Sequence, residues 1–317
     1  MKVLLVGPYP PPHGGVSVHV ASVARGLHER GVTQRVLDTS RASNRILFTL
    51  ALVRFAATGW TIHFHANGHN WKDWSIAFHC GLLGRPRARS ILTLHSGLTP
   101  DYLAVAPRSM RVIARRACAL HGRVICVSHP IRESLLSIGV RKDSIEVAEA
   151  FEGTIHAPDV VLHPNLAAWM RRHHPVLSTT LFFRPEYGFD ILVSALRRLR
   201  DRYPALGCVV MGTGEDRESA ERLVRDAGLT ANIFFAGDVD HDACLTVMSR
   251  SHVFVRGTLC DGDSISVREA LALGVPVAAS RTAFRPHGVT LFAAGDADAM
   301  ADAIEATLNR ELIEEGA

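Results

Sequence analysis

The feature that most constrains the fold of this chain is a repeated alternation of short, continuous apolar segments with longer amphipathic ones. Continuous apolar segments are typical of strands buried on both faces of a parallel sheet, and the amphipathic segments are typical of the helices that cover it. The predicted strands are KVLLVG, TIHFHA, SILTLHS, RVICVS, TTLFF, GCVVMG, NIFFAG, HVFVRG and VPVAAS, with helices predicted at 16–30, 108–121, 190–203, 216–227, 242–249 and 266–273. The pattern predicts an α/β protein.

The length of 317 residues exceeds one ordinary α/β core and indicates two domains. The stretch from about 150 to 175 carries scattered Pro, Gly and His without periodicity, so we place the boundary there. We predict two domains, at 1–160 and 161–317, both Rossmann-like, doubly wound and parallel. Two such domains would bind ligands in a cleft between the carboxyl ends of their sheets.

The composition indicates a globular protein whose halves differ in charge. Hydrophobic residues make up 47% of the chain and charged residues 21%, and the six cysteines form no C-x-x-C pair, which favours reduced thiols and a cytoplasmic protein. The apolar N-terminus is too short for a signal peptide, and no apolar run is long enough to span a bilayer. Net charge is +9 over residues 1–163 and −5 over 164–317, which indicates different partners for the two halves.

Two glycines and one histidine of the first half are candidate site residues. Gly14 and Gly15 precede a predicted helix, where backbone amides approach an anionic ligand, although a structural turn explains them equally well. Their spacing is not G-x-G-x-x-G, so a nicotinamide dinucleotide site is not indicated. His95 follows a buried strand and precedes Ser96 and Gly97, which favours a substrate-contacting role over a purely structural one.

A zinc site is a weaker hypothesis for the segment HFHANGHN. It would use His63, His65 and His69, but no nearby carboxylate or cysteine completes the ligand shell.

In the second half, Arg184 follows a predicted strand, where its planar guanidinium can hold a diphosphate; the alternative is a surface ion pair with Glu186. Gly212 lies in VVMGTGED, a strand, turn and helix of low specificity that we include among the candidate ligand-binding segments.

The segment DGDSISVREALALGVPVAAS gives the most specific signal. A helix starting at Ser266 would place Glu269 in its first turn, where it can accept hydrogen bonds from ribose hydroxyls. The amides of residues 264–266 would point toward a negative ligand. The two aspartates of the D-G-D stretch lack further oxygen ligands apart from Glu269, so the eight-residue spacing from Asp261 to Glu269 is a stronger signal than a metal site.

The order of GPYPPPHGGV, LTLHSG, RPEYGFDIL, VVMGTGED, AGDVDH and the DGD segment resembles the retaining GT-B glycosyltransferases of family 4, in their bacterial polysaccharide and glycolipid branch. The resemblance covers residue 2 to about 305 and includes the E-x7-E motif at Asp261 and Glu269. It implies a ribose contact for Glu269 and donor-sugar contacts for the segment from Asp261 through Gly262, Asp263, Ser264 and Ile265, next to Ser266. It also implies that the domain at 1–160 binds the acceptor and the domain at 161–317 binds the nucleotide-sugar donor. It implies a catalytic-site role for His95, and neither a metal nor a cofactor.

Two positions depart from the family pattern. Tyr187 stands where the diphosphate-binding motif has Lys, and no Lys occurs after Lys142, so Arg184 would supply that charge alone or with Arg256 or Arg268. Asp261 is one methylene shorter than the Glu of the motif.

We therefore expect a metal-independent retaining transferase that moves a sugar from a nucleotide diphosphate sugar to a glycan, glycolipid or lipid-linked acceptor in cell-surface polysaccharide synthesis. One alternative is a sugar-nucleotide epimerase of the same fold, for which Glu29, Asp38, Asp73 and Asp101 are the available acids, none of them expected at a strand end. Another is a non-catalytic sugar-nucleotide-binding partner protein.

The basic first half suggests where the acceptor is met. Residues 46–57 form an apolar run near Arg41, Arg45 and Arg54, and Arg108, Arg111 and Arg115 repeat along one helical face. This favours peripheral binding at the inner face of the plasma membrane, with a core helix and solvated arginines as the equally weighted alternative. Nucleic acid is not an expected partner, because no recognition motif is present.

Overall fold

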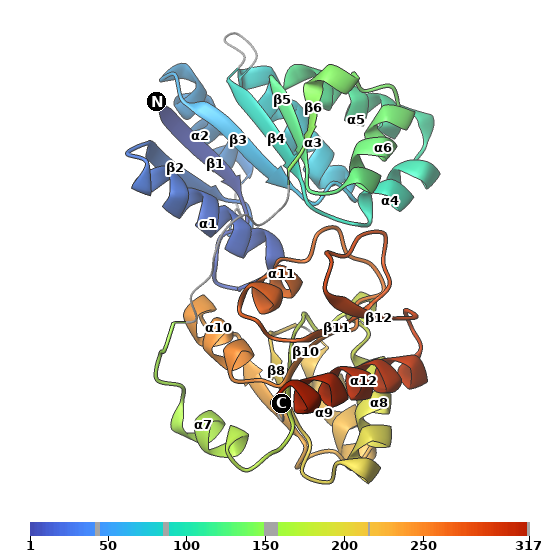
Figure 1. Ribbon diagram of the computed structural model, residues 1–317. Coiled ribbons are helices and arrows are strands. Elements are labelled where there is room, and N and C mark those ends of the chain that lie inside the picture. Colours follow the sequence, from blue (N-terminus) through green and yellow to red (C-terminus); the bar gives the residue numbers. More distant parts are fainter. Residues whose placement is uncertain (42–44, 85–88, 149–157, 215, 316–317) are drawn as a thin grey trace. The chain divides into compact units, whose positions relative to one another are not determined.

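The computed structural model describes residues 1–41, 45–84, 89–148, 158–214 and 216–315 (Figure 1). The chain divides into two compact units. The first comprises Met1–Pro11, Gly15–Glu152 and Asp261–Asp263, and the second comprises Pro12–Gly14, Gly153–Cys260 and Ser264–Ala317. Part of the predicted linker, residues 150–157, lies outside the described residues.

The first unit is built on a six-stranded parallel sheet of order β2-β1-β3-β4-β5-β6. Its central strands are continuous apolar segments, with Leu4, Leu5, Ile62, Leu92 and Val124 fully buried. The strands are β1 Lys2–Gly7, β2 Thr33–Asp38, β3 Thr61–Ala66, β4 Ser90–Leu94, β5 Arg123–Cys126 and β6 Ile145–Val147.

Helices cover this sheet. The helices are α1 Gly15–Glu29, α2 Arg45–Ala57, α3 Trp71–Gly84, α4 Thr99–Val105, α5 Arg108–Leu120 and α6 His129–Ser137, with a 3-10 turn at Lys142–Ser144. Helix α1 packs on β1 and β2 through Val20 and Ala24. Helix α3 packs on β3 and β4 and contacts both α2 and α5, so these three helices share one layer.

The second unit repeats the design with a parallel sheet of order β12-β11-β10-β7-β8-β9. The strands are β7 Val176–Thr180, β8 Gly207–Met211, β9 Ile233–Gly237, β10 Val253–Arg256, β11 Val277–Ser280 and β12 Val289–Phe292. The helices are α7 Pro164–Met170, α8 Phe189–Arg202, α9 Arg217–Asp226, α10 His241–Ser249, α11 Ile265–Ala272 and α12 Ala297–Glu315, with a 3-10 turn at Pro185–Tyr187.

Side chains of the second sheet alternate between two apolar clusters, as the two-residue period of a strand requires. In β10, Val253 and Val255 join the cluster that contains residues of α8 and α12, whereas Phe254 joins the cluster that contains residues of α10 and α11. Both faces of the sheet are therefore covered, which explains why most residues of these strands are apolar. The predicted α/β class with two parallel sheets is confirmed.

Several predicted boundaries differ from the structure. The strand predicted as TTLFF is VLSTT, because the chain leaves the ladder after Thr180 while Leu181 and Phe183 stay buried in the core. The helix predicted to start at Ser266 begins at Ile265, so Glu269 is its fifth residue and lies in the second turn. Strands β2, β6 and β12 were not predicted, because they carry more polar and exposed residues than the strands beside them.

None of the helices in the described part of the chain has both the length and the apolar character needed to cross a membrane.

Candidate functional site

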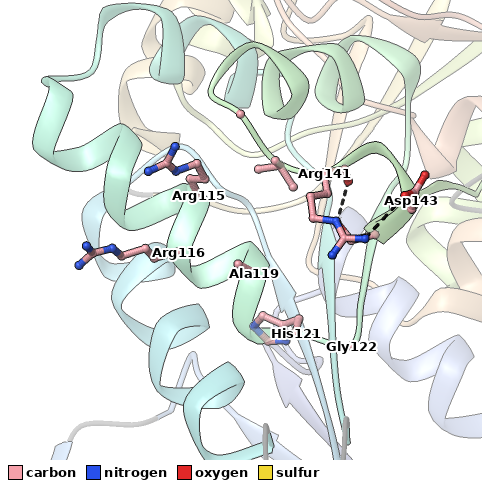
Figure 2. Close-up of a pocket in the computed structure, with 10 residues that line it drawn as sticks. Arg115, Arg116, Ala119, His121, Gly122, Arg141 and Asp143 are labelled. Carbon is pink, nitrogen blue, oxygen red and sulfur yellow. Dashed lines mark hydrogen bonds and ion pairs between the residues drawn. The ribbon is translucent and has the colours of Figure 1, made fainter.

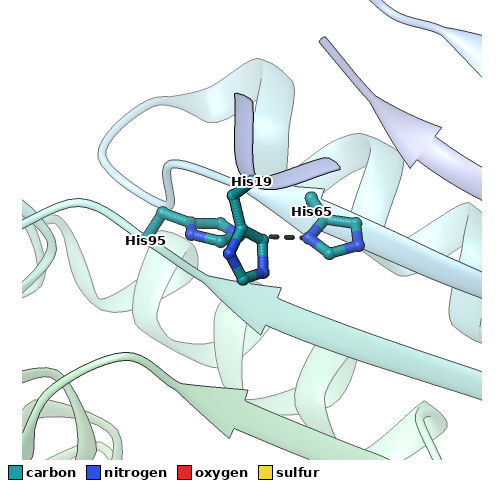
Figure 3. A group of neighbouring side chains, drawn as sticks. All are labelled: His19, His65 and His95. Carbon is teal, nitrogen blue, oxygen red and sulfur yellow. Dashed lines mark hydrogen bonds between the residues drawn. The ribbon is translucent and has the colours of Figure 1, made fainter. Parts of the chain in front are cut away.

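Among the predicted site residues of the first unit, His95 directly follows β4 and is 8% exposed. Its Nε2 lies 3.1 Å from Nδ1 of the buried His65 on β3, within hydrogen-bond distance. The ring of His19, from α1, lies 4.7 Å from the ring of His95 between centroids. Figure 3 shows the three rings converging from three separate elements.

The arrangement differs from the zinc hypothesis for HFHANGHN. His65 groups with His19 and His95, and not with His63 and His69. The rings of His63 and His65 are tilted by 32° with centroids 4.1 Å apart, but Nε2 of His63 is hydrogen-bonded to Thr93 Oγ1 at 2.8 Å and is therefore already engaged. His19 was missed because its position becomes informative only when α1 is placed beside β3 and β4.

Burial keeps these histidines neutral. Loss of hydration, with smaller contributions from His19 and His121, lowers the pKa of His63 to about 3. The same cause holds the pKa of His65 and of His95 well below the ordinary range, again with neighbouring rings adding to the effect. At neutral pH the cluster therefore offers uncharged imidazole nitrogens.

In the second unit, the predicted ribose-binding acid Glu269 is 4% exposed and lies on α11, the helix after β10. His241, the first residue of α10, donates from Nε2 to Oε1 of Glu269 at 2.6 Å. A buried carboxylate requires such a partner, and the bond holds one of its oxygens in place. Sequence reasoning missed His241, although AGDVDH was among the segments of the resemblance.

The segment between β10 and the body of α11 is largely buried. Gly262, Asp263, Ser264 and Ile265 are buried, and Asp261 is partly buried. Ser264 is the residue before the helix, and its hydroxyl lies 3.3 Å from that of Ser266. The first amides of a helix lack an intrahelical acceptor, so this end of α11 presents N–H donors.

The three arginines considered for the diphosphate have different surroundings. Arg184 is exposed after β7, with its guanidinium 5.6 Å from the ring centroid of Phe182, and no ion pair joins it to Glu186 within the described ranges. Arg256 is buried and donates to the Thr180 carbonyl at 2.7 Å. The guanidinium of Arg268 lies 5.7 Å from the Phe284 ring centroid. Arg184 is thus the most accessible of the three.

The predicted glycines lie at strand-to-helix connections. Gly212 follows β8 with a φ of +136°, and a Cβ there would lie 1.8 Å from the carbonyl oxygen of Leu181, so only glycine fits. Gly15 is the first residue of α1, and Gly14 immediately precedes it.

One acid proposed for the epimerase alternative is placed differently from expectation. Asp38 ends β2, a strand that was not predicted. Its Oδ1 accepts hydrogen bonds from the backbone N–H of Tyr9 and of Ser40 and from the Ser40 hydroxyl, so this carboxylate organises the adjoining turn.

A pocket of about 570 Å³ lies elsewhere in the first unit (Figure 2). It is lined by residues of α5 and of the turn before β6, among them Arg115, Arg116, His121 and Arg141. Gly122 in its wall immediately precedes β5, which places the pocket at the amino edge of the parallel sheet. His95 lies at the opposite, carboxyl edge, where ligands of such sheets bind, so the pocket is separate from the candidate site.

Comparison with known proteins agrees with this architecture. Residues 181–315 match the family model described as glycosyl transferases group 1. A phosphatidyl-myo-inositol mannosyltransferase of Propionibacterium freudenreichii subsp. shermanii is 26% identical over 308 residues, covering 88% of this chain and 77% of that protein. A GDP-mannose-dependent alpha-(1-6)-phosphatidylinositol monomannoside mannosyltransferase of Mycolicibacterium smegmatis is 28% identical over 166 residues, covering 47% of this chain and 42% of that protein.

Solved structures show the same fold. HepE of Anabaena in complex with UDP-glucose superposes with a TM-score of 0.71 at 17% identity, covering 99% of this chain and 94% of that one. Sucrose-phosphate synthase of Thermosynechococcus elongatus gives a TM-score of 0.72 at 18% identity, covering 98% and 90%. The fold is that of the GT-B glycosyltransferases. The matched segment and the relatives support a group 1 glycosyltransferase of the family 4-like type, as the sequence motifs predicted.

Proposed function

We propose that this protein is a retaining glycosyltransferase that moves a sugar from a nucleotide diphosphate sugar to a glycan, glycolipid or lipid-linked acceptor in cell-surface polysaccharide synthesis. The observation that carries the proposal is the buried Glu269, held by His241 at the carboxyl edge of the second sheet beside a helix start. A fixed carboxylate suits ribose hydroxyls, and helix amides suit a diphosphate.

The relatives support the same classes of substrate. Two of them are named as mannosyltransferases of phosphatidylinositol or its mannoside, one dependent on GDP-mannose. One structural neighbour holds UDP-glucose. We therefore propose a nucleotide sugar as donor and an acceptor that carries a lipid, met at an anionic membrane surface on the cytoplasmic side.

Each candidate residue has one role on this proposal. Glu269 binds the ribose, the segment 261–266 binds the sugar, and Arg184 stabilises the negative charge that grows on the diphosphate as the glycosidic bond breaks. The leaving phosphate accepts the proton of the acceptor hydroxyl, so no side chain serves as general base. His95 contacts the sugar being transferred.

The proposed transfer requires no metal ion. We expect turnover to be the same before and after the protein is treated with EDTA. Loss of turnover on chelation, with recovery on adding Mn²⁺ or Mg²⁺, would contradict the proposal.

Donor binding is tested with a panel of nucleotide diphosphate sugars in a thermal-shift assay. A ligand that binds the folded state raises its stability by RT ln(1 + [L]/Kd), so the donor should raise the unfolding temperature more than its nucleotide monophosphate does. The responding donor is then incubated with acceptor lipids, and the anomeric configuration of the product is read by NMR. Inversion of that configuration would overturn the retaining assignment, and donor binding without hydrolysis or transfer would favour the non-catalytic alternative.

A further inference from the structure

Three ring nitrogens of the first unit lie close enough together to share one ion. His19 comes from α1, His65 from β3 and His95 from the end of β4, and one ligand nitrogen from each lies within 4.8 Å of the others. Figure 3 shows the three rings facing a common point. The proposed transfer assigns no role to His19 or His65.

The spacing of two of these nitrogens already matches a metal shell. Nδ1 of His65 and Nε2 of His95 lie 3.1 Å apart. With Zn–N bonds of about 2.0–2.1 Å, two nitrogens of a tetrahedral shell lie about 3.3 Å apart. The ion would replace the hydrogen bond between the two rings with little movement, and a small rotation of the His19 ring would complete the set.

The donor set indicates which ions fit. Imidazole nitrogens suit Zn²⁺, Co²⁺, Ni²⁺ and Cu²⁺, whereas Mg²⁺ and Ca²⁺ prefer oxygen ligands. His65 and His95 are 1% and 8% exposed; His65 lies on β3, and His95 directly follows the adjacent β4 and bonds through its backbone N–H to the Ala66 carbonyl, so both ligands are held by the sheet. Three protein ligands also leave one coordination position open, as in zinc sites that keep a water.

We propose that His19, His65 and His95 form a binding site for one divalent transition-metal ion, with Zn²⁺ as the expected occupant. A consequence that rests on the proposed function is inhibition of the transfer by the ion, because a His95 ring that binds the ion could no longer contact the transferred sugar. Metal binding and the proposed metal-free transfer are compatible, since chelation would leave activity intact and Zn²⁺ would lower it.

The test uses the full chain without an affinity tag, freed of metal by chelator and dialysis, and titrated with Co²⁺ as a spectroscopic probe and with Zn²⁺ in a calorimeter. We expect one equivalent to bind, with visible absorption typical of a four- or five-coordinate nitrogen site. His19→Gln, at a partly exposed position, should weaken binding by about tenfold or more, since even residues that only orient metal ligands contribute 10–100-fold.

The matched control is His79→Gln. His79 is exposed on α3 and bonds through Nδ1 to the Ser75 carbonyl of its own helix, so this change should leave metal binding unaltered. His65→Gln provides a second variant, with folding of each protein checked by circular dichroism.

Equal affinity of the unsubstituted protein and His19→Gln, or the absence of a visible Co²⁺ band, would overturn the site. Donor binding is measured separately by thermal shift. A Co²⁺ band without any donor response would contradict the proposed function and leave the metal site standing, and the reverse result would remove only the metal site.

Discussion

At the scale of single residues, the contact between His241 and Glu269 is the most informative one in the second unit. Both residues lie on helices that pack against each other, and the 2.6 Å bond joins the start of α10 to the second turn of α11. A buried carboxylate in this position costs hydration, and the protein compensates part of that cost with one charge-assisted bond. The proposed function assigns a ribose contact to this carboxylate.

Glu269→Gln should weaken donor binding, because a carboxamide accepts hydrogen bonds less strongly and its NH₂ group would face a donor. We expect a loss of about 1–3 kcal/mol in donor binding, the range for a hydrogen bond to a charged group. Calorimetry with the donor identified in the thermal-shift panel measures this. Glu218→Gln, at an exposed acid of α9, is the control and should bind normally. Unchanged affinity of Glu269→Gln would remove Glu269 from the site.

His121 shows how burial of one residue couples stability to pH. It is 5% exposed, and its Nε2 donates to the carbonyl of Ala77 at 2.9 Å. Loss of hydration lowers its pKa to about 4, although the bond to Ala77 acts in the opposite direction. Between pH 6.5 and about 4 the unfolded chain therefore binds a proton that the folded chain does not.

The free energy of unfolding should fall as the pH is lowered through this window, by about 1.4 kcal/mol per pH unit for His121. His121→Gln keeps a donor for Ala77 and removes the titration. Between pH 7.5 and 5, its free energy of unfolding should fall by about 2 kcal/mol less than that of the unsubstituted protein. Urea denaturation at several pH values measures the difference; His121 contributes to the lowered pKa of His63, but that pKa is about 3, below the pH range used. Parallel pH profiles would contradict the prediction.

At the scale of elements, the connection from β7 to α8 carries the most accessible of the three arginines. The turn Pro185–Tyr187 follows Arg184 and ends at Gly188, whose φ of +64° directs the chain into α8. Arg256 donates to the end of β7, and its guanidinium lies 5.2 Å from the Tyr187 ring centroid. Tyr187, at the position where the family pattern has Lys, thus packs on the guanidinium of the buried Arg256.

Arg184→Ala should lower kcat by about 10²-fold or more, comparable to the loss of one preorganised donor to a developing negative charge. Steady-state kinetics with the identified donor measures this. Arg222→Ala, at an exposed arginine of α9, is the control and should keep a normal kcat. A near-normal kcat for Arg184→Ala would transfer the role to another arginine, and Arg268 would be replaced next.

The order of most elements was predictable because strands buried on two faces must be apolar throughout. Edge strands escape this rule, and β2, with the sequence TQRVLD, was missed for that reason. The boundary of β7 was missed because Leu181 and Phe183 are more apolar than the last three residues of the strand and are buried beyond its end. Apolar residues are predicted to be buried. Where a strand ends depends on its backbone hydrogen bonds to the neighbouring strand, which the sequence does not show.

At the scale of the whole molecule, motifs local in sequence were predictable and clusters assembled from distant segments were not. Glu269 was identified from the E-x7-E spacing within one loop and helix, and its burial agrees with a binding role. His19 and His241 were missed because the residues that each one contacts lie at least 28 positions away in the chain. Spacing along one segment fixes local geometry, whereas the meeting of α1 with β3 and β4 depends on the folded sheet.

The basic first unit also exposes an apolar surface. Helix α2 buries Leu52 but exposes Ile46, Leu47, Leu50 and Val53, with Ile46 72% and Leu50 60% exposed. Their spacing places them on one helical face. The alternative of a core helix at 46–57 is therefore wrong. Arg54, Arg108, Arg111 and Arg115 are exposed on α2 and α5, which share a layer through α3.

This surface predicts binding to anionic liposomes and not to neutral ones, because exposed apolar side chains enter the headgroup boundary while arginines are attracted to anionic lipids. Each basic residue near such a surface contributes about 1 kcal/mol, so replacing Arg108, Arg111 and Arg115 by Gln should weaken binding by about 100-fold. Replacing the exposed Arg171, Arg172 and Arg225 of the second unit by Gln removes the same charge and should have little effect.

Leu47→Glu with Leu50→Glu tests the apolar part of the surface and should weaken binding to anionic liposomes. Flotation at rising salt should show release as the attraction is screened. Equal recovery with anionic and neutral liposomes would refute the membrane surface and favour an acceptor met in solution.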